Sequence, residues 1–299
     1  MPHRRDIETR NGTRVAVHAR RPDRSAEEAV VFVHGATFGA RPAFDTPGYS
    51  WLADTASRGR AAYAVDAVGY GDSDRPAAMD DPDGDPPSRA DRVATDLRRV
   101  LDALARDHDR LHLVGYSWGT MVAGVACTRS TEVASLVQFA PVYDPDPARV
   151  SAFDPGRDPA PKREATRTET RDRWDAHLPV PSDHRDPDAF DRFWTTLFDG
   201  QGVSDDPPTV EAPNGTLLDL TAAATGGPIY DAADIAVSTL VVRGSLDQTA
   251  TREDGLRLYD DLTTGEAEYT EIANGSHFLA LERRRDTLFD RVATFHDGQ

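Results

Sequence analysis

Cysteine, lysine and long apolar runs are scarce in this sequence, and each scarcity excludes a class of protein. Cys127 is the only cysteine among 299 residues, so neither an internal disulfide nor a cysteine zinc cluster can form. No run approaches roughly 18 consecutive apolar residues, so no segment is expected to cross a membrane. The N-terminal residues contain no apolar stretch of the kind found in signal peptides. We therefore expect a cytoplasmic protein.

Positive charge is also in short supply, because 34 lysines and arginines face 51 aspartates and glutamates. The net charge is -17, and Lys162 is the only lysine. Nucleic acids and anionic membrane surfaces would meet like charge and are poor partners. Adaptation to a salt-rich cytoplasm and a GC-rich genome both account for the composition. We favour the salt explanation, because codon bias alone does not require so large a charge imbalance.

The most informative motif lies between residues 110 and 124. Residues 111–114 predict a short buried strand, and residues 120–128 predict a helix of small residues. Between them, Gly115-Tyr-Ser117-Trp-Gly119 fits the pattern G-x-S-x-G. Because glycine has no Cβ atom, the two glycines let neighbouring backbone approach a sharp strand-to-helix corner. The Ser117 hydroxyl would stand exposed at that corner, beside a helix N-terminus that favours developing negative charge.

Three further motifs follow expected strands. His34-Gly-Ala36 comes after the apolar run 29–33, Asp247 ends the sequence Arg-Gly-Ser-Leu-Asp, and His277 lies in Gly-Ser-His-Phe. With these motifs in the order serine, aspartate, histidine, the sequence resembles the α/β-hydrolase family from about residue 12 to residue 296. It is most similar to the esterase- and lipase-like branch with a serine nucleophile. The resemblance implies an α/β fold, with a mostly parallel, doubly wound sheet and an inserted helical cap.

Alternating apolar strands and amphipathic helices predict the elements of the core. We expect a hairpin over residues 4–20 that turns at Asn11-Gly12. Strands are expected at 29–33, 61–65, 111–114, 134–139, 238–243 and 267–272. Helices are expected at 47–58, 88–107, 120–128, 251–261 and 281–295, with Ser88 as the N-cap of the second. Residues 144–232 lose this alternation, so residues 1–143 and 233–299 are expected to form the core. The intervening segment is expected to form the cap, with helices at 162–177, 187–198 and 214–224.

The resemblance implies that Ser117, Asp247 and His277 are the catalytic residues. His277 would take the proton of the Ser117 hydroxyl and return it to the leaving group, while Asp247 would orient the imidazole. Asp144 is an alternative acid, since some members of the family use a position after the preceding strand. The context of Asp247 favours it over Asp144, which opens an Asp-Pro-Asp-Pro run typical of a turn. Such a mechanism requires no metal and no cofactor.

The resemblance also implies where the oxyanion and the substrate would bind. The oxyanion hole would combine the backbone N–H groups of Ala36 and Trp118, with Thr37 as the less favoured donor in place of Ala36. His34 is interpreted as a structural residue of its turn. The expected substrate-binding residues are Thr37, Phe38, Trp174, Trp194 and Phe278. An aromatic stripe at helical spacing either lines an acyl pocket or fastens the cap, and we favour fastening for most of its members, Phe190, Phe193, Trp194 and Leu197.

Several reactions fit these residues. A small-molecule ester, lactone or thioester cleaved through an acyl-serine intermediate is the favoured substrate, and oligomeric state stays open. Ser117 excludes the dehalogenases and epoxide hydrolases that carry an aspartate at this position. The turn HGATFG makes aminopeptidase activity less favoured than ester hydrolysis. Hydrolysis of C–C bonds in aromatic breakdown products, a cofactor-free oxygenase and a ligand-binding protein without turnover are the remaining alternatives.

Overall fold

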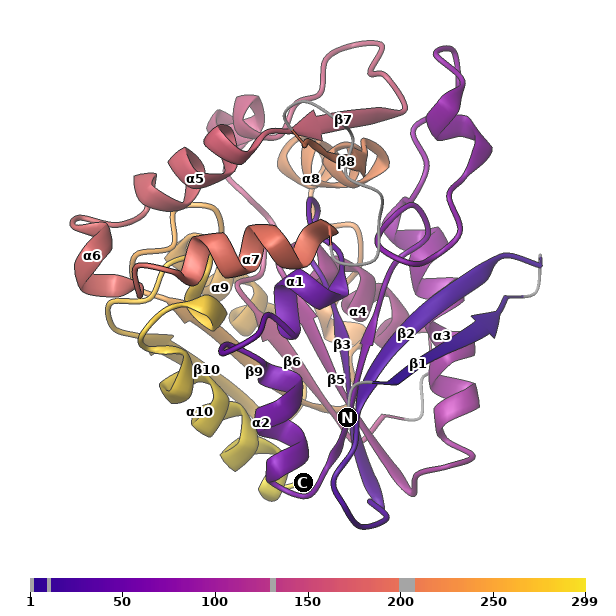
Figure 1. The fold of residues 1–299 in the computed structure, drawn as a ribbon, viewed down its shortest axis with the longest axis vertical. Coiled ribbons are helices and arrows are strands. Elements are labelled where there is room, and N and C mark those ends of the chain that lie inside the picture. Colours follow the sequence, from indigo (N-terminus) through magenta and orange to yellow (C-terminus); the bar gives the residue numbers. More distant parts are fainter. Residues whose placement is uncertain (1–2, 10–11, 130–132, 199–207) are drawn as a thin grey trace.

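An eight-stranded sheet forms the centre of the computed structural model, which describes residues 3–9, 12–129, 133–198 and 208–299 (Figure 1). In spatial order its strands are β1 (His3–Glu8), β2 (Arg14–Arg20), β4 (Ala61–Val65), β3 (Glu28–Val33), β5 (Arg110–Tyr116), β6 (Ser135–Phe139), β9 (Ser238–Gly244) and β10 (Ala267–Ile272). β2 runs antiparallel to β1 and β4, and the strands from β4 to β10 are parallel. The predicted fold class, α/β with a mostly parallel sheet, is confirmed.

Helices cover both faces of this sheet, which explains why its central strands are buried and rich in apolar residues. The core helices are α2 (Trp51–Ser57), α3 (Ala90–Leu104), α4 (Trp118–Thr128), α9 (Arg252–Asp261) and α10 (Arg285–Asp297). α2 packs against α10, where the rings of Trp51 and Phe289 stack at 4.8 Å, while α3 packs against α4 (Figure 1). Every residue of β4 and of β6 is buried. Because the parallel strands end on one edge of the sheet, the loops that follow them meet there.

The chain between β6 and β9 lies over that edge, in the upper part of Figure 1. It contains β7 (Lys162–Ala165), α5 (Arg167–Ala176), α6 (Pro181–His184), α7 (Ala189–Phe198), β8 (Val210–Pro213) and α8 (Gly215–Gly226). An apolar cluster joins this segment to the core and comprises Phe38, Tyr49, Trp174, Leu178, Ala189, Phe190, Phe193, Trp194, Phe278 and Leu281. The cap limits at residues 144 and 232 stay predictions.

The cap differs from the sequence prediction at its start. Residues 162–165, expected to begin a helix, form β7, which pairs antiparallel with β8. The helix begins only at Arg167, after Thr166, whose hydroxyl accepts a hydrogen bond from the Glu169 N–H in a capping box. The pairing of β7 joins segments more than forty residues apart, so no local pattern revealed it. The short helices α6 and α1 (Ala40–Phe44) were not predicted either.

Ser88 is not the N-cap that the sequence suggested. Its φ of 65° lies in the left-handed region, and its hydroxyl donates to the Val68 carbonyl instead. Helix α3 begins at Ala90, whose N–H donates to the Asp219 carboxylate at 2.7 Å, so a residue of α8 caps this helix. At the N-terminal hairpin, Gly12 has the positive φ expected of the turn, while Asn11 lies outside the described residues. Among the described helices, none is long and apolar enough to cross a membrane.

Candidate active site

Ser117 occupies the corner between β5 and α4. Its φ of 56° is unusual for a residue with a side chain, and such strain persists only where the surrounding structure fixes it. A Cβ atom on Gly119 would lie 2.3 Å from the Val33 carbonyl oxygen, and one on Gly115 would lie 2.6 Å from the Gly119 carbonyl oxygen. Both glycines are therefore required for β5 and α4 to meet the end of β3 at this corner.

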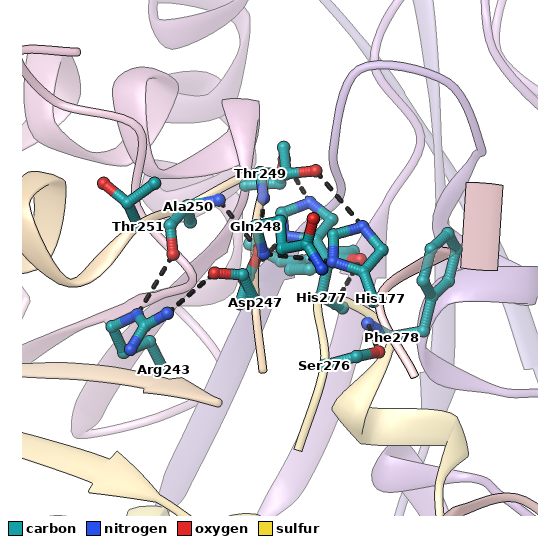
Figure 2. A network of polar contacts seen from close by, with 12 residues as sticks. His177, Arg243, Asp247, Gln248, Thr249, Ala250, Thr251, Ser276, His277 and Phe278 are labelled. Atoms are coloured by element: carbon teal, nitrogen blue, oxygen red, sulfur yellow. Dashed lines mark hydrogen bonds and ion pairs between the residues drawn. The ribbon is translucent and has the colours of Figure 1, made fainter. Parts of the chain in front are cut away.

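Ser117, His277 and Asp247 form a continuous hydrogen-bonded chain. The His277 Nε2 atom lies 2.9 Å from the Ser117 Oγ atom, and its Nδ1 atom lies 2.8 Å from the Asp247 Oδ2 atom. The other oxygen of Asp247 accepts the N–H groups of Thr249 at 2.8 Å and Ala250 at 2.9 Å (Figure 2). Burial acts to raise the pKa of the Asp247 carboxyl, but His277 and these hydrogen bonds outweigh it and lower that pKa.

The loop that carries His277 is tied to its surroundings by a buried carboxylate that the sequence analysis missed. Glu282 accepts hydrogen bonds from the Ser276 N–H and from the Trp174 indole N–H, both at 2.9 Å, and from the Ser276 hydroxyl. The Tyr116 hydroxyl donates to the His277 carbonyl oxygen at 2.8 Å. Burial raises the pKa of the Glu282 carboxyl, although its hydrogen bonds with Ser276 act to lower it. Glu282 thus links the cap to the histidine loop.

A second residue of the cap contacts the acid loop. His177, at the end of α5, accepts the Gln248 N–H at its Nδ1 atom, 3.0 Å away, beside Asp247 (Figure 2). The imidazole rings of His177 and His277 lie nearly parallel, with centroids 6.1 Å apart. Burial, followed by the charge of His277, lowers the pKa of His177. His177 is therefore neutral near pH 7 and acts as a hydrogen-bond acceptor between the cap and the acid loop.

Asp144, the alternative acid, lies away from this chain of hydrogen bonds. Its carboxylate contacts the Arg257 guanidinium at 3.4 Å, and 39% of its side chain is exposed. Asp247, by contrast, is buried against His277. The structure thus brings Asp247, and not Asp144, to the imidazole.

The backbone of the His34 turn lies directly beside Ser117. A Cβ atom on Gly35 would be 3.1 Å from the Ser117 Cβ atom, which is tighter than an ordinary contact, so glycine favours this approach. Trp118 is the first residue of α4, and its N–H therefore has no acceptor within the helix. The carbonyl of Ala36 is fixed by the Tyr70 hydroxyl at 2.6 Å. An oxyanion hole formed by the N–H groups of Ala36 and Trp118 stays a prediction.

His34 itself is a structural residue of this turn. Its side chain is wholly buried, with its Nδ1 atom 2.7 Å from the Gly35 carbonyl oxygen and its Nε2 atom accepting the Ala67 N–H at 3.0 Å. Burial lowers the pKa of the imidazole. With both ring nitrogens engaged, His34 has no free position for proton transfer.

A cavity of about 320 Å³ opens beside Ser117 and His277. Of the expected substrate-binding residues, Thr37, Phe38 and Phe278 line it. Trp174 and Trp194 are not among its lining residues, and their role in substrate binding stays a prediction. The Trp174 indole stacks on Phe278 at 4.9 Å and is held by Glu282.

The aromatic stripe of α7 mainly fastens the cap. The ring of Trp194 stacks on Phe190 at 6.1 Å and meets Phe198 edge to face at 5.4 Å, so its area is used in packing within the cap. Phe193 is the member of the stripe that reaches the cavity. The sequence analysis missed the remaining cap residues of the wall, which include Arg149, Arg173, Leu217 and Leu220.

One group of side chains in the described structure has spacing suited to a metal, away from Ser117. It comprises His18, Asp66 and Asp72. The buried Asp66 carboxylate already lies 2.7 Å from the His18 Nε2 atom and accepts the N–H groups of Ala40 and Asp72. These contacts fasten the loop after β4.

The sheet order, the strained serine and the serine–histidine–aspartate chain define the architecture of an α/β-hydrolase. The pattern of the alpha/beta hydrolase family matches residues 30–291, so the chain belongs to that family and is an enzyme of this class. No curated protein matches the sequence significantly.

Solved structures share the fold over nearly the whole chain. A meta-cleavage product hydrolase, CumD of Pseudomonas fluorescens IP01, has a TM-score of 0.69 at 19% identity and covers 99% of this chain and 98% of its own. A thioesterase domain from the curacin biosynthetic pathway has a TM-score of 0.68 at 15% identity, covering 98% and 99%. An esterase from Exiguobacterium antarcticum has a TM-score of 0.64 at 16% identity, covering 97% and 98%.

Proposed function

We propose that this enzyme hydrolyses a small-molecule carboxylic ester, thioester or lactone through an acyl-serine intermediate. The observation that carries the proposal is the hydrogen-bonded chain from Ser117 through His277 to Asp247, at the wall of the cavity. This arrangement supplies a nucleophile, a base within hydrogen-bond reach and a buried acid that orients the base.

In the first half of the reaction, the Ser117 oxygen bonds to the substrate carbonyl carbon as His277 takes the hydroxyl proton at Nε2. Asp247 holds the proton on Nδ1 and stabilises the resulting imidazolium. The N–H groups of Ala36 and Trp118 stabilise the oxyanion, with each such donor contributing about 10²- to 10³-fold in rate. The bond to the leaving group then breaks and His277 returns the proton to it. In the second half, water repeats these steps on the acyl-serine.

The proposal is tested with p-nitrophenyl esters from acetate to palmitate, beside lactones, thioesters and aminoacyl anilides. We expect steady turnover of at least one ester series, and a fluorophosphonate adduct on the peptide that contains Ser117. The Ser117→Ala variant should lose both. Labelling or turnover that persists in this variant would exclude Ser117 as the nucleophile.

Hydrolysis of a C–C bond is the second candidate, because the same serine and histidine serve proton transfer to carbon and CumD shares the fold. A wild-type protein that takes the fluorophosphonate on Ser117 but leaves every ester, lactone, thioester and anilide intact would favour this candidate. Ring-cleavage products of aromatic compounds would then be the substrates to assay.

A further inference from the structure

Arg173 of α5 places a guanidinium in the wall of the active-site cavity. Burial lowers the pKa of this group. Arg173 nevertheless keeps a large accessible surface. Arg173 lines the cavity together with Ser117 and His277.

This guanidinium has almost no hydrogen-bond partner. Its one polar contact among the described residues is with the Thr37 hydroxyl at 3.4 Å, and no carboxylate there forms an ion pair with it. The rings of Phe38 and Phe278 lie 5.4 and 5.5 Å from its central carbon. Aromatic rings attract the charge but do not replace an oxygen acceptor for its five N–H donors.

A neighbouring arginine shows what a structural guanidinium looks like in this protein. Arg163 of β7 is half-buried and has no carboxylate partner among the described residues, but it donates to the carbonyl oxygens of Ala36 and Pro213 and to the Asn214 side chain. Arg149, which also lines the cavity, pairs with Asp254 at 2.8 Å. Of these three, only Arg173 has neither a carboxylate nor a carbonyl partner among the described residues.

The composition makes this lack of a partner significant. Acidic residues outnumber basic ones by 51 to 34, and arginines across the described surface form ion pairs with them. An unpaired charge surrounded by protein costs free energy, which a bound anion would recover. The overall charge of -17 repels anions, so any preference for them must come from the site itself.

We infer that the substrate of this enzyme carries an anionic group, a carboxylate in its simplest form, which Arg173 binds in the cavity beside Ser117. The inference rests on the proposed function and narrows its substrate class. Guanidinium N–H groups match the two oxygens of a carboxylate in a bidentate pair. The carboxylate belongs either to the acyl part or to the leaving group, since Arg173 contacts both Thr37, next to the oxyanion donor, and Phe278, next to the base.

Two pairs of substrates separate these sources. For the acyl part, mono-p-nitrophenyl adipate is compared with p-nitrophenyl adipamate, in which a neutral amide replaces the carboxylate. For the leaving group, 4-acetoxybenzoate is compared with 4-acetoxybenzamide. The variant is Arg173→Gln, and the matched control is Arg171→Gln, which removes a charge from the same helix at a residue that contacts Asp191 and Phe190. Circular dichroism confirms that each variant is folded.

We expect the wild type to prefer the carboxylate over the amide in one pair by about 10-fold or more in kcat/KM. Arg173→Gln should lower kcat/KM for that carboxylate by about 10- to 100-fold, mainly through KM, and change the amide less than about 3-fold. Arg171→Gln should change neither. The inference would be overturned if the wild type had equal kcat/KM for the carboxylate and the amide in both pairs. It would also be overturned if Arg173→Gln lowered kcat/KM equally for both substrates of a pair.

A binding measurement separates this inference from the proposed function. Calorimetric titration of the wild type with adipate and with 4-hydroxybenzoate reports anion binding without turnover, and p-nitrophenyl acetate reports hydrolysis without an anion. In one outcome, the wild type binds these carboxylates, loses that binding in Arg173→Gln, and yet hydrolyses no ester. This result would support the anion site and reject ester hydrolysis. Hydrolysis of p-nitrophenyl acetate without binding of either carboxylate would reject the anion site alone.

Discussion

Replacing Asp247 by asparagine should reverse the proton arrangement of His277 while changing almost no volume. One oxygen of Asp247 accepts the N–H groups of Thr249 and Ala250, and an amide nitrogen cannot replace it there because two donors would face each other. The amide oxygen must therefore take that position, and the amide N–H₂ group must face the Nδ1 atom of His277. Nδ1 then becomes an acceptor and the ring proton moves to Nε2.

An Nε2–H group 2.9 Å from the Ser117 oxygen cannot accept the serine proton. In serine proteases the same substitution lowers kcat by about 10⁴-fold, or about 5 kcal/mol in activation free energy. We expect a loss of that order in Asp247→Asn, measured as initial rates on the best p-nitrophenyl ester. The melting temperature and the circular dichroism spectrum should stay close to those of the wild type.

Asp144→Asn is the matched control for this prediction. The Asp144 carboxylate only contacts Arg257 near the surface, so its replacement should change kcat less than about twofold. The reasoning is refuted if Asp247→Asn keeps more than about a tenth of the wild-type kcat, since several decades are expected from loss of the base. An equal loss in folded Asp144→Asn would assign the acid to that residue.

Three further outcomes concern stability. The melting temperature should rise from about 0.1 M to about 2 M KCl, because salt shortens the Debye length and screens the excess negative charge. Burial lowers the pKa of His112 to about 4, so its neutral form stabilises the fold above pH 6.5, and this stability should be lost as the pH falls toward 4, by up to about 3 kcal/mol. Gly119→Ala should cost about 2 kcal/mol or more in unfolding free energy, because its Cβ atom would overlap the Val33 and His34 carbonyls.

Each of these outcomes has a control. A melting temperature independent of KCl would favour codon bias as the origin of the composition. His112→Gln should flatten the decline of unfolding free energy between pH 6.5 and 4 at constant salt, and an unchanged decline would contradict the assignment to His112. Gly226→Ala is the control for Gly119→Ala, because a Cβ atom at the end of α8 meets nothing within 4 Å. Denaturant titration of both variants should show a loss only at Gly119.

Most elements of the core could be predicted from local sequence. Segments rich in apolar residues predicted the central parallel strands, since a strand covered on both faces is mostly apolar. Ser117 could be placed at a corner from its two glycines, because the close approach they permit is a requirement on residue type. The positions of Asp247 and His277 after their strands followed from the same alternation, and parallel strands bring such loops to one edge.

Local sequence did not predict how the cap packs on that edge of the sheet. β7 was predicted as helix because its pairing with β8 crosses a long connection. Ser88 was expected to cap α3, but the capping group belongs to Asp219 of α8. Glu282 resembled any other surface glutamate of a C-terminal helix until the fold buried it against Trp174.

The sequence by itself therefore determined the architecture and the corner position of Ser117, because strand periodicity and the need for glycine are local. Only the tertiary structure decided which aromatic side chains line the cavity and which fasten the cap. It alone distinguished Arg173, which lines the cavity and has one polar contact with Thr37, from Arg163, which donates to backbone carbonyls. Two arginines in one acidic chain look alike in sequence, and their roles differ because a hydrogen-bond partner is fixed by position in space.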